Sequence, residues 1–247
     1  MLIHHLKRQV SEGKKIFALL IDPDKHTPES IEKLFAGLNN KPGPELILVG
    51  GSLLFNGVAG IIAAIKQHSQ TPVFLFPGSV LHVTENADGI LLLSLLSGRN
   101  PEFLIGNHVQ AAPMIRKAGL EVIPTGYLLI NSGVNTSVSY MSNTAPIPYE
   151  KTDIAVATAM AGEMLGMQLI YLEAGSGAQK PVSEAMILAV KNNTSIPLVV
   201  GGGIKTLEQL IKVLNAGADM VVVGTAAETN PQIITAFASH FAEQNKI

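Results

Sequence analysis

The chain has 247 residues, no cysteine, and 17 Lys and Arg against 19 Asp and Glu, for a net charge of -2. This balance offers no broad attraction to nucleic acid or to an anionic membrane, and the lack of cysteine excludes disulfides, zinc–thiolate sites and thiol nucleophiles. The length suits one domain over residues 1–247. Because the sequence shows no secretory signal and no apolar run near the roughly 18 residues that span a bilayer, we expect a cytoplasmic protein without a transmembrane segment.

Eight short apolar runs alternate with amphipathic stretches, a pattern typical of parallel strands joined by crossover helices. Most of the runs are continuously apolar, as expected for strands buried on both faces. We therefore predict an α/β fold, a TIM (β/α)8 barrel, with strands at 16–22, 45–50, 72–76, 89–96, 121–130, 168–173, 197–201 and 220–224. Helical patterns lie between most of them, at 28–38, 58–68, 103–118, 154–165, 182–192, 207–216 and 231–243.

The third crossover departs from this pattern. Residues 77–88 are barely enough for a helical connection and are poor in helix formers. The sequence therefore predicts that the third helix is shortened or missing.

The segment 131–152 is far longer than the roughly 2 to 6 residues usual for such a loop. It follows a strand, so in a barrel it would lie on the catalytic face as a lid or binding segment. A disordered insertion is the alternative. Its residues Tyr140, Met141, Ile147 and Tyr149 favour packing against the rest of the protein.

Carboxylates and a hydroxyl follow the first two strands. Strand one ends in Asp22-Pro23-Asp24, and strand two ends in Gly50-Gly51-Ser52. A few oxygen ligands beside a phosphate site suit Mg²⁺, which keeps several waters and takes further ligands from substrate phosphates. Asp22 and Ser52 are thus candidate magnesium ligands, which Asp24 could join. The alternative is that either aspartate caps the following helix.

Three later strand ends open into small residues. They are Tyr171-Leu172-Glu173-Ala174-Gly175-Ser176-Gly177, Gly201-Gly202-Gly203 and Gly224-Thr225. In α/β barrels, phosphate commonly binds after strands seven and eight, and backbone N–H groups approach an anion closely only where side chains are small. Together these ends predict one phosphate cradle, although such glycines also serve tight chain reversals.

Glu173 is the only charged residue in its segment. A carboxylate at the end of strand six would point into the central site, where partial burial raises its pKa, so Glu173 is a candidate general base. The alternative is a structural ion pair with Lys180 or Lys205. His26 and His82 also lie near predicted strand ends, where an isolated histidine is more often solvated than catalytic.

In combination, these motifs resemble the geranylgeranylglyceryl phosphate synthase family over essentially the whole chain. Its enzymes are modified TIM barrels with a replaced third helix, and they join sn-glycerol 1-phosphate to a polyprenyl diphosphate through an ether bond. The resemblance implies Mg²⁺ at Asp22 and Ser52, with Glu173 and Tyr171 at the glycerol end where the ether forms. It implies that glycerol phosphate contacts Tyr171, Leu172, Glu173, Ala174, Gly175, Ser176, Gly177, Gly202, Gly203, Gly224 and Thr225.

One position separates two branches of that family. The branch that includes heptaprenyl enzymes has a lysine two positions before the strand-one aspartate, where this chain has Leu20. The chain is therefore similar to the branch that includes geranylgeranyl enzymes, which implies geranylgeranyl diphosphate as the prenyl donor. For a barrel this apolar we also expect a homo-oligomer.

Two other classes of function remain open. A sugar-phosphate isomerase or a flavin mononucleotide oxidoreductase would use the same glycines, but the acidic end of strand one favours a metal-bound diphosphate. A non-catalytic protein that binds phosphate or prenyl lipid would share the cradle as well. Retained ligand binding with lost turnover in Glu173→Gln would distinguish the enzyme from such a protein.

Overall fold

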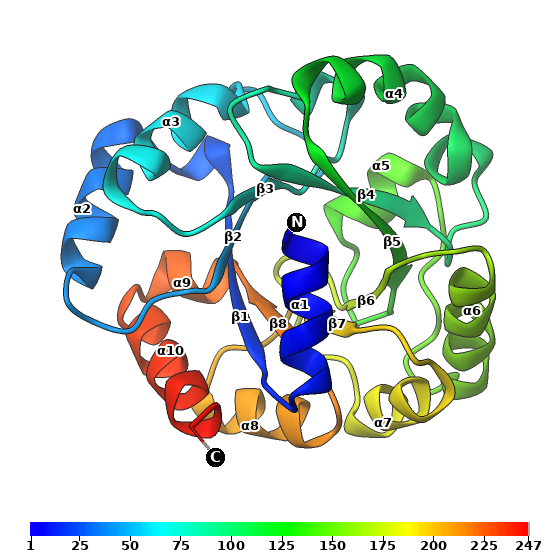
Figure 1. Cartoon of the computed structure of the whole chain (residues 1–247). Helices are drawn as coiled ribbons and strands as arrows, with labels where there is room; N and C mark the ends of the chain where they lie inside the picture. The colour runs from blue at the N-terminus through cyan, green and yellow to red at the C-terminus, as the bar shows by residue number, and fades with distance from the viewer. Residues whose placement is uncertain (247) are drawn as a thin grey trace.

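A computed structural model describes residues 1–246 and contains a closed barrel of eight parallel strands that follow one another in chain order (Figure 1). The barrel closes where β1 pairs with β8, with Ile16 opposite Met220. The predicted TIM barrel is confirmed, and each strand ends within two residues of its predicted bounds. The strands are β1 (Ile16–Ile21), β2 (Leu46–Val49), β3 (Val73–Leu75), β4 (Gly89–Leu95), β5 (Glu121–Leu129), β6 (Leu169–Glu173), β7 (Leu198–Gly201) and β8 (Met220–Val223).

Helices cover the outside of the barrel (Figure 1). They are α2 (Pro28–Leu38), α3 (Val58–His68), α4 (Asn107–Ala118), α6 (Thr152–Met164), α7 (Glu184–Asn193), α8 (Leu207–Asn215) and α10 (Gln232–Gln244). The first two match their predicted ranges, and α4 is preceded by a π-helix, η3 (Glu102–Gly106). Between β3 and β4 lies only a short 3-10 turn, η2 (Val80–His82), which confirms the missing third helix.

Four further elements were not predicted: α1 (Leu2–Ser11), η1 (Pro23–Lys25), α5 (Ser137–Ser142) and α9 (Thr225–Thr229). The last three are too short to show a repeated helical pattern in the sequence. Both η1 and α9 directly follow strands, while α5 lies in the long segment after β5.

Helix α1 covers the end of the barrel where the strands begin, and it lies across the front of the view in Figure 1. Its Ile3 and Leu6 are buried in the barrel core. Its first backbone N–H groups, on Leu2 and Ile3, donate to the carboxylate of Glu121 at 2.6 and 2.9 Å. Since Met1 provides no side-chain cap, this distant carboxylate satisfies the helix start.

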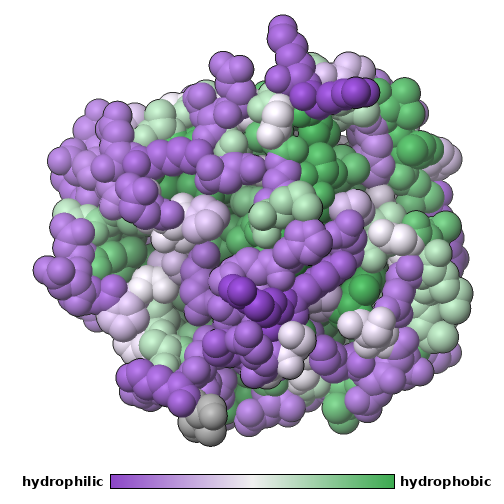
Figure 2. All heavy atoms as spheres, in the orientation of Figure 1, coloured by the Kyte–Doolittle hydropathy of each residue, from purple (hydrophilic) through white to green (hydrophobic). Residues whose placement is uncertain are grey.

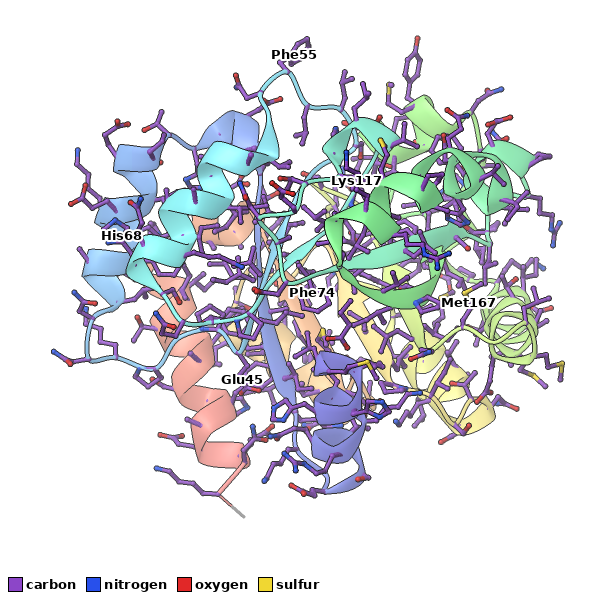
Figure 3. All side chains as sticks on the ribbon, turned by 45° about the horizontal axis from the view of Figure 1, so that its top comes forward. Glu45, Phe55, His68, Phe74, Lys117 and Met167 are labelled. Atoms are coloured by element: carbon purple, nitrogen blue, oxygen red, sulfur yellow. The ribbon has the colours of Figure 1, made fainter. Side chains whose placement is uncertain are left out.

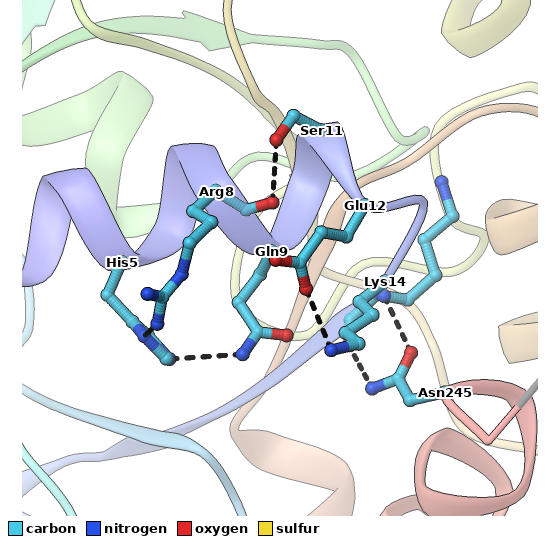
Figure 4. Close-up of polar contacts among 8 residues, drawn as sticks. His5, Arg8, Gln9, Ser11, Glu12, Lys14 and Asn245 are labelled. Carbon is cyan, nitrogen blue, oxygen red and sulfur yellow. Dashed lines mark hydrogen bonds and ion pairs between the residues drawn. The ribbon is translucent and has the colours of Figure 1, made fainter.

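The outer side of α1 is polar. Figure 2 shows hydrophilic residues over this helix, and Figure 4 shows contacts among His5, Arg8 and Gln9 on its surface. Just beyond the helix, Lys15 exchanges two 2.9 Å hydrogen bonds with Asn245, which tie it to the end of α10. The one apolar side of this helix thus faces inward, and its other sides face water.

The apolar residues form two layers on opposite faces of the strands. Ile16 and Ala18 point into the barrel, while Phe17, Leu19 and Ile21 pack against the surrounding helices. Successive side chains of a strand alternate between faces, so burial on both faces requires a continuous apolar run. Across residues 1–246, none of the helices has the length and apolar character needed to cross a membrane.

Candidate active site

Glu173 ends β6 and turns into the mouth of the barrel. Its side chain is 6% exposed, and its Oε1 accepts a 2.6 Å hydrogen bond from the backbone N–H of Gly175. Burial raises the pKa of Glu173 because desolvation disfavours the carboxylate, and the Gly175 hydrogen bond opposes this effect only in part. Among the ion pairs of residues 1–246, none involves Glu173, so a structural pair with Lys180 or Lys205 is wrong.

Three aromatic rings lie below Glu173 in the barrel. The centroid of Tyr171 is 5.3 Å from that of Tyr127 and 5.6 Å from that of Phe76. Burial, and then the charge of Glu173, raises the pKa of both tyrosines well above the ordinary value, so both hydroxyls stay protonated. The Tyr171 hydroxyl is buried beside Glu173 and completes no well-formed hydrogen bond within the described chain.

The glycines after β6 and β7 bring two loops into contact. Gly175, Gly177, Gly202 and Gly203 have φ angles of 95°, 76°, 81° and 73°, in the left-handed region that favours glycine. A Cβ on Gly202 would lie 2.5 Å from Glu173 Oε1 and 2.7 Å from the nitrogen of Gly175. Glycine at 202 therefore lets the backbone after β7 lie against the Glu173 carboxylate and the loop after β6.

The loop after β8 joins the same group. Thr225 opens α9, and its hydroxyl lies 3.2 Å from that of Ser176. A Cβ on Gly224 would lie 3.4 Å from Leu20, whose apolar side chain flanks this side of the mouth. The three strand ends predicted to form a phosphate cradle are thus brought together.

At two of the predicted substrate contacts, Leu172 and Ala174, the side chain points away from the mouth of the barrel. The side chains of Leu172 and Ala174 are buried in the outer core, between the strands and the helices. Residues 171 and 173 face the barrel interior, so the alternation of a strand turns residue 172 outward. Only the backbone at these two positions can contribute to the mouth of the barrel.

Asp22 and Ser52 lie on neighbouring strand ends. Asp22 Oδ1 accepts a 3.0 Å hydrogen bond from the N–H of Asp24, and a Cβ on Gly51 would lie 3.8 Å from that same oxygen. Asp22 therefore caps η1, while Thr27 caps α2, so the proposal that an aspartate caps α2 is wrong.

Asp24 has a different role from Asp22. Its two carboxylate oxygens accept backbone N–H groups of Phe55 and Asn56 at 2.9 and 2.8 Å, so it anchors the loop between β2 and α3. Nowhere in residues 1–246 do three or more His, Cys, Asp or Glu side chains gather as a metal-binding group. Any metal here would need most of its ligands from water and substrate.

Lys25 links the first and last strand ends. Its Nζ lies 2.8 Å from Glu228 Oε2, on α9, and 3.5 Å from Asp22 Oδ2. The ion pair holds η1 next to α9, so the Asp22 side of the mouth is fixed to the Thr225 side.

An apolar cleft opens where the third helix is missing. It encloses about 860 Å³ of empty space, part of it open to solvent, between η2, η3, α4 and α5. Ile90, Leu92 and Ile115 form much of its wall, while Ser52 and Tyr127 also line it. The cleft thus extends from the Asp22 side of the mouth to the aromatic rings below Glu173.

The long segment after β5 is ordered and packed, so a disordered insertion is wrong. Ile147 forms a bridge with Ile130, and the side chain of Thr136 packs against Gly175. Tyr149 donates from its hydroxyl to the carbonyl of Pro181 at 3.3 Å. Val138, Met141 and Ser142, in α5, line the apolar cleft. Tyr140 was expected to pack but is exposed.

The two candidate histidines have structural surroundings. His26 Nδ1 lies 3.2 Å from the hydroxyl of Ser30, and His82 is buried with its Nδ1 3.3 Å from the N–H of Gly78. Burial lowers the pKa of each. Neither lines the cleft beside Glu173.

Known proteins match the chain over nearly all of its length. The sequence profile of the PcrB family matches residues 8–241. The chain belongs to the PcrB family. A geranylgeranylglyceryl phosphate synthase from Spirosoma linguale is 50% identical over 235 residues, which cover 95% of this chain and 94% of the relative. A protein of the same name from Pyrococcus abyssi is 41% identical and covers 93% and 90%.

A solved structure is similar to the whole barrel. It is (S)-3-O-geranylgeranylglyceryl phosphate synthase from Thermoplasma acidophilum, in complex with its substrate sn-glycerol-1-phosphate. The two structures align with a TM-score of 0.91 at 31% identity, covering 100% of this chain and 99% of that one. The modified barrel is thus common to this chain and to that synthase.

In this PcrB family member, the sequence did not predict the residues that connect the cleft, the glycine loops and the acidic strand end. Phe76 and Tyr127 join the cleft to Tyr171, and Lys25 joins two strand ends through Glu228. A tyrosine within a buried parallel strand was one available signal for Tyr127, because a buried hydroxyl needs a partner. The ion pair had no such signal, since its residues are 203 positions apart.

Proposed function

We propose that this PcrB family member is a prenyltransferase that forms an ether bond between the 3-hydroxyl of sn-glycerol 1-phosphate and geranylgeranyl diphosphate, with release of diphosphate. The names of the relatives and the bound substrate of the Thermoplasma acidophilum structure support this choice of substrates. The observation that carries it is the position of Glu173. This buried carboxylate lies between the glycine loops and the aromatic end of an apolar cleft.

Glu173 would accept the proton of the attacking hydroxyl. In the reaction, the glycerol oxygen bonds to C1 of the prenyl chain, the bond from C1 to the diphosphate oxygen breaks, and its electron pair leaves with diphosphate. A carboxylate whose pKa is raised by burial is a better proton acceptor than an exposed one. The unpartnered hydroxyl of Tyr171 lies beside it and would orient the glycerol.

The phosphate of sn-glycerol 1-phosphate would bind the loops after β6, β7 and β8. Gly175, Gly202 and Gly203 place backbone close to this space, and Ser176 and Thr225 add hydroxyls. Leu20 contributes no charge here, so binding at this end would rely on backbone and hydroxyl donors.

The diphosphate would bind on the opposite side, with Mg²⁺ held by Asp22 and Ser52. A carboxylate and a hydroxyl on adjacent strand ends fit an ion that keeps several waters and takes oxygen atoms from phosphate. When bound, Mg²⁺ would offset the negative charge of the leaving diphosphate. Removal of divalent ions with a chelator should abolish product formation, and Mg²⁺ should restore it; turnover that persists would remove this part of the proposal.

The apolar cleft would hold the prenyl chain. Its walls and the α5 segment exclude water from the carbon that reacts, which protects an allylic cation from hydrolysis. The prenyl chain would begin near Phe76 and Tyr127, at the aromatic end of the cleft. It would then run along the space where a third helix would otherwise lie.

A product assay tests the whole proposal. Purified protein with Mg²⁺ is supplied with sn-glycerol 1-phosphate or its 3-phosphate enantiomer, together with prenyl diphosphates of graded length. We expect ether product from the 1-phosphate and geranylgeranyl diphosphate. Failure to use any of these pairs would overturn the assignment, and a yellow, flavin-containing preparation would favour an oxidoreductase. The cytoplasmic location and the homo-oligomer stay predictions.

A further inference from the structure

The mouth of the apolar cleft is surrounded by exposed apolar side chains from three separate segments. They are residues 51–57 after β2, 77–83 after β3 and 134–148 after β5; we call them the rim. Each segment contributes wall residues to the cleft, such as Ser52, Val80 and Met141. Each also exposes a large apolar side chain beside them: Phe55 is 88% exposed, Leu81 is 85% and Tyr140 is 85%.

The rim carries no charge. None of its three segments contains Asp, Glu, Lys or Arg, although these residues make up 15% of the chain. The carboxylate of Asp24 contacts the rim, but both its oxygens are occupied by the backbone N–H groups of Phe55 and Asn56. A surface without charged groups loses little hydration when an apolar phase covers it.

The rim side chains are held outward by the backbone beneath them. Figure 3 shows Phe55 projecting from the tip of its loop at the top of the view. The Asp24 hydrogen bonds hold the backbone at Phe55 and Asn56, and a capping box from Thr136 begins the short helix that carries Tyr140. Their exposure is therefore built into the fold.

We infer that the rim docks on the surface of a lipid bilayer and opens the cleft directly to it. The inference rests on the proposed function, since a prenyl substrate of twenty carbons resides in the membrane and gains roughly 0.8 kcal/mol for each CH₂ group that stays out of water. Isolated aromatic and aliphatic tips insert into the interfacial region, where an aromatic ring with one polar end is well placed. A second copy of the chain over the rim would close the mouth through which substrate and product must pass.

A flotation experiment with the full chain and vesicles of phosphatidylcholine tests the docking. Phosphatidylcholine has no net charge, so binding reports apolar insertion. The rim variant combines Phe55→Ser, Leu81→Ser and Tyr140→Ser. The control combines Val109→Ser, Met164→Ser and Leu165→Ser, which are 66%, 80% and 73% exposed on the flank of the barrel. None of these six residues lines the cleft, and thermal melts check that both variants fold.

We expect the rim variant to lose at least about tenfold in vesicle affinity, while the control binds as the unmodified chain does. Equal binding of all three proteins, or no binding of the unmodified chain, would overturn the inference. So would a rim variant that changes the oligomer mass in light scattering without changing flotation, because the rim would then be a protein interface.

Turnover separates this inference from the proposed function. With geranyl diphosphate dissolved in water, the rim variant should keep the rate of the unmodified chain. With geranylgeranyl diphosphate supplied in the same vesicles, it should lose at least about tenfold. If the unmodified chain makes product from neither substrate, the proposed function fails while flotation still decides the docking. If the rim variant loses the two activities equally, the rim serves catalysis and the docking is wrong.

Discussion

The two halves of the barrel mouth differ in what lines them: backbone in one half and apolar side chains in the other. After β6 and β7, glycines with positive φ place backbone against the site, and Gly202 has no room for a side chain beside Glu173 and Gly175. Between β3 and β4 a helix is missing, and apolar side chains from the segments after β2, β3 and β4 line the resulting cleft. An anion is bound by close backbone donors, whereas a hydrocarbon chain needs only apolar volume, so one fold serves both by different means.

Glu173 lies where the two halves meet, and its replacement should have the largest effect. Glu173→Gln keeps the size of the side chain and removes the proton acceptor, so kcat should fall about 10²- to 10⁴-fold. Calorimetric binding of sn-glycerol 1-phosphate should be retained. In the unmodified enzyme, kcat/KM should rise with pH as Glu173 ionises, with its midpoint above the ordinary value of 4.5 because burial raises the pKa. Unchanged turnover in the variant would remove Glu173 as the base.

Asp22→Asn should act on the diphosphate side alone. It removes a charged ligand, so the Mg²⁺ concentration for half-maximal turnover should rise roughly ten- to hundredfold, by analogy with the loss of a strong metal contact. The matched control is Asp24→Asn, whose carboxylate holds the rim loop, and its Mg²⁺ requirement should stay unchanged. The same Mg²⁺ shift in both variants would show that the two aspartates act together.

Gly202→Ala should weaken binding on the phosphate side and also displace the Glu173 carboxylate. The new Cβ would meet Glu173 Oε1 and the nitrogen of Gly175, so KM for sn-glycerol 1-phosphate should rise about tenfold, a loss of about 1.4 kcal/mol. Gly166→Ala is the control, because φ is 91° there and no atom lies within 4 Å of its Cβ. Both variants should lose about 1–2 kcal/mol of stability from the left-handed backbone, and Gly202→Ala should lose more because its Cβ also meets the backbone of Gly175. An unchanged KM in Gly202→Ala would show that this loop does not bind phosphate.

Ala111→Leu should act on the cleft alone. Ala111 lines the cleft on α4, and a longer side chain there should raise KM for geranylgeranyl diphosphate about three- to tenfold, with little change for geranyl diphosphate. Val109→Leu adds bulk on the exposed side of the same helix and should change neither value. Equal effects on both substrates would place the far part of the prenyl chain elsewhere.

The smallest expected effect is the change in melting temperature that Glu173→Gln causes as pH is varied. Because burial raises the folded-state pKa of Glu173, its proton stabilises the folded protein below pH 4.5, and this stabilisation is lost as pH rises through the folded pKa. Glu173→Gln resembles the protonated acid, so its melting temperature should exceed that of the unmodified chain at pH 8. The difference should disappear as pH falls toward 4.5. A constant difference at all pH values would show that ionisation of Glu173 does not cause it.

The barrel was readable from the sequence because its strands are buried on both faces, which leaves continuous apolar runs. The missing third helix was readable as well, since residues 77–88 are too short and too poor in helix formers. Helix α1 was missed although its apolar residues recur at helical spacing; only its cap, supplied by Glu121, which lies 118 residues beyond Ile3, had no local signal. Tyr140 was misjudged, since the six-residue helix that carries it is too short for its sequence to indicate which side faces the protein.

The sequence by itself determined the alternating strands and helices, the small residues at the strand ends and the lone charge of Glu173. These are local properties, set by periodicity, backbone freedom and side-chain chemistry. Only the tertiary structure decided that Phe76, Tyr127 and Tyr171 join Glu173 to the cleft, and that Asp24 holds a loop while Asp22 borders Gly51. Such contacts depend on how the closed barrel brings distant strand ends within a few ångströms, and no local pattern encodes that distance.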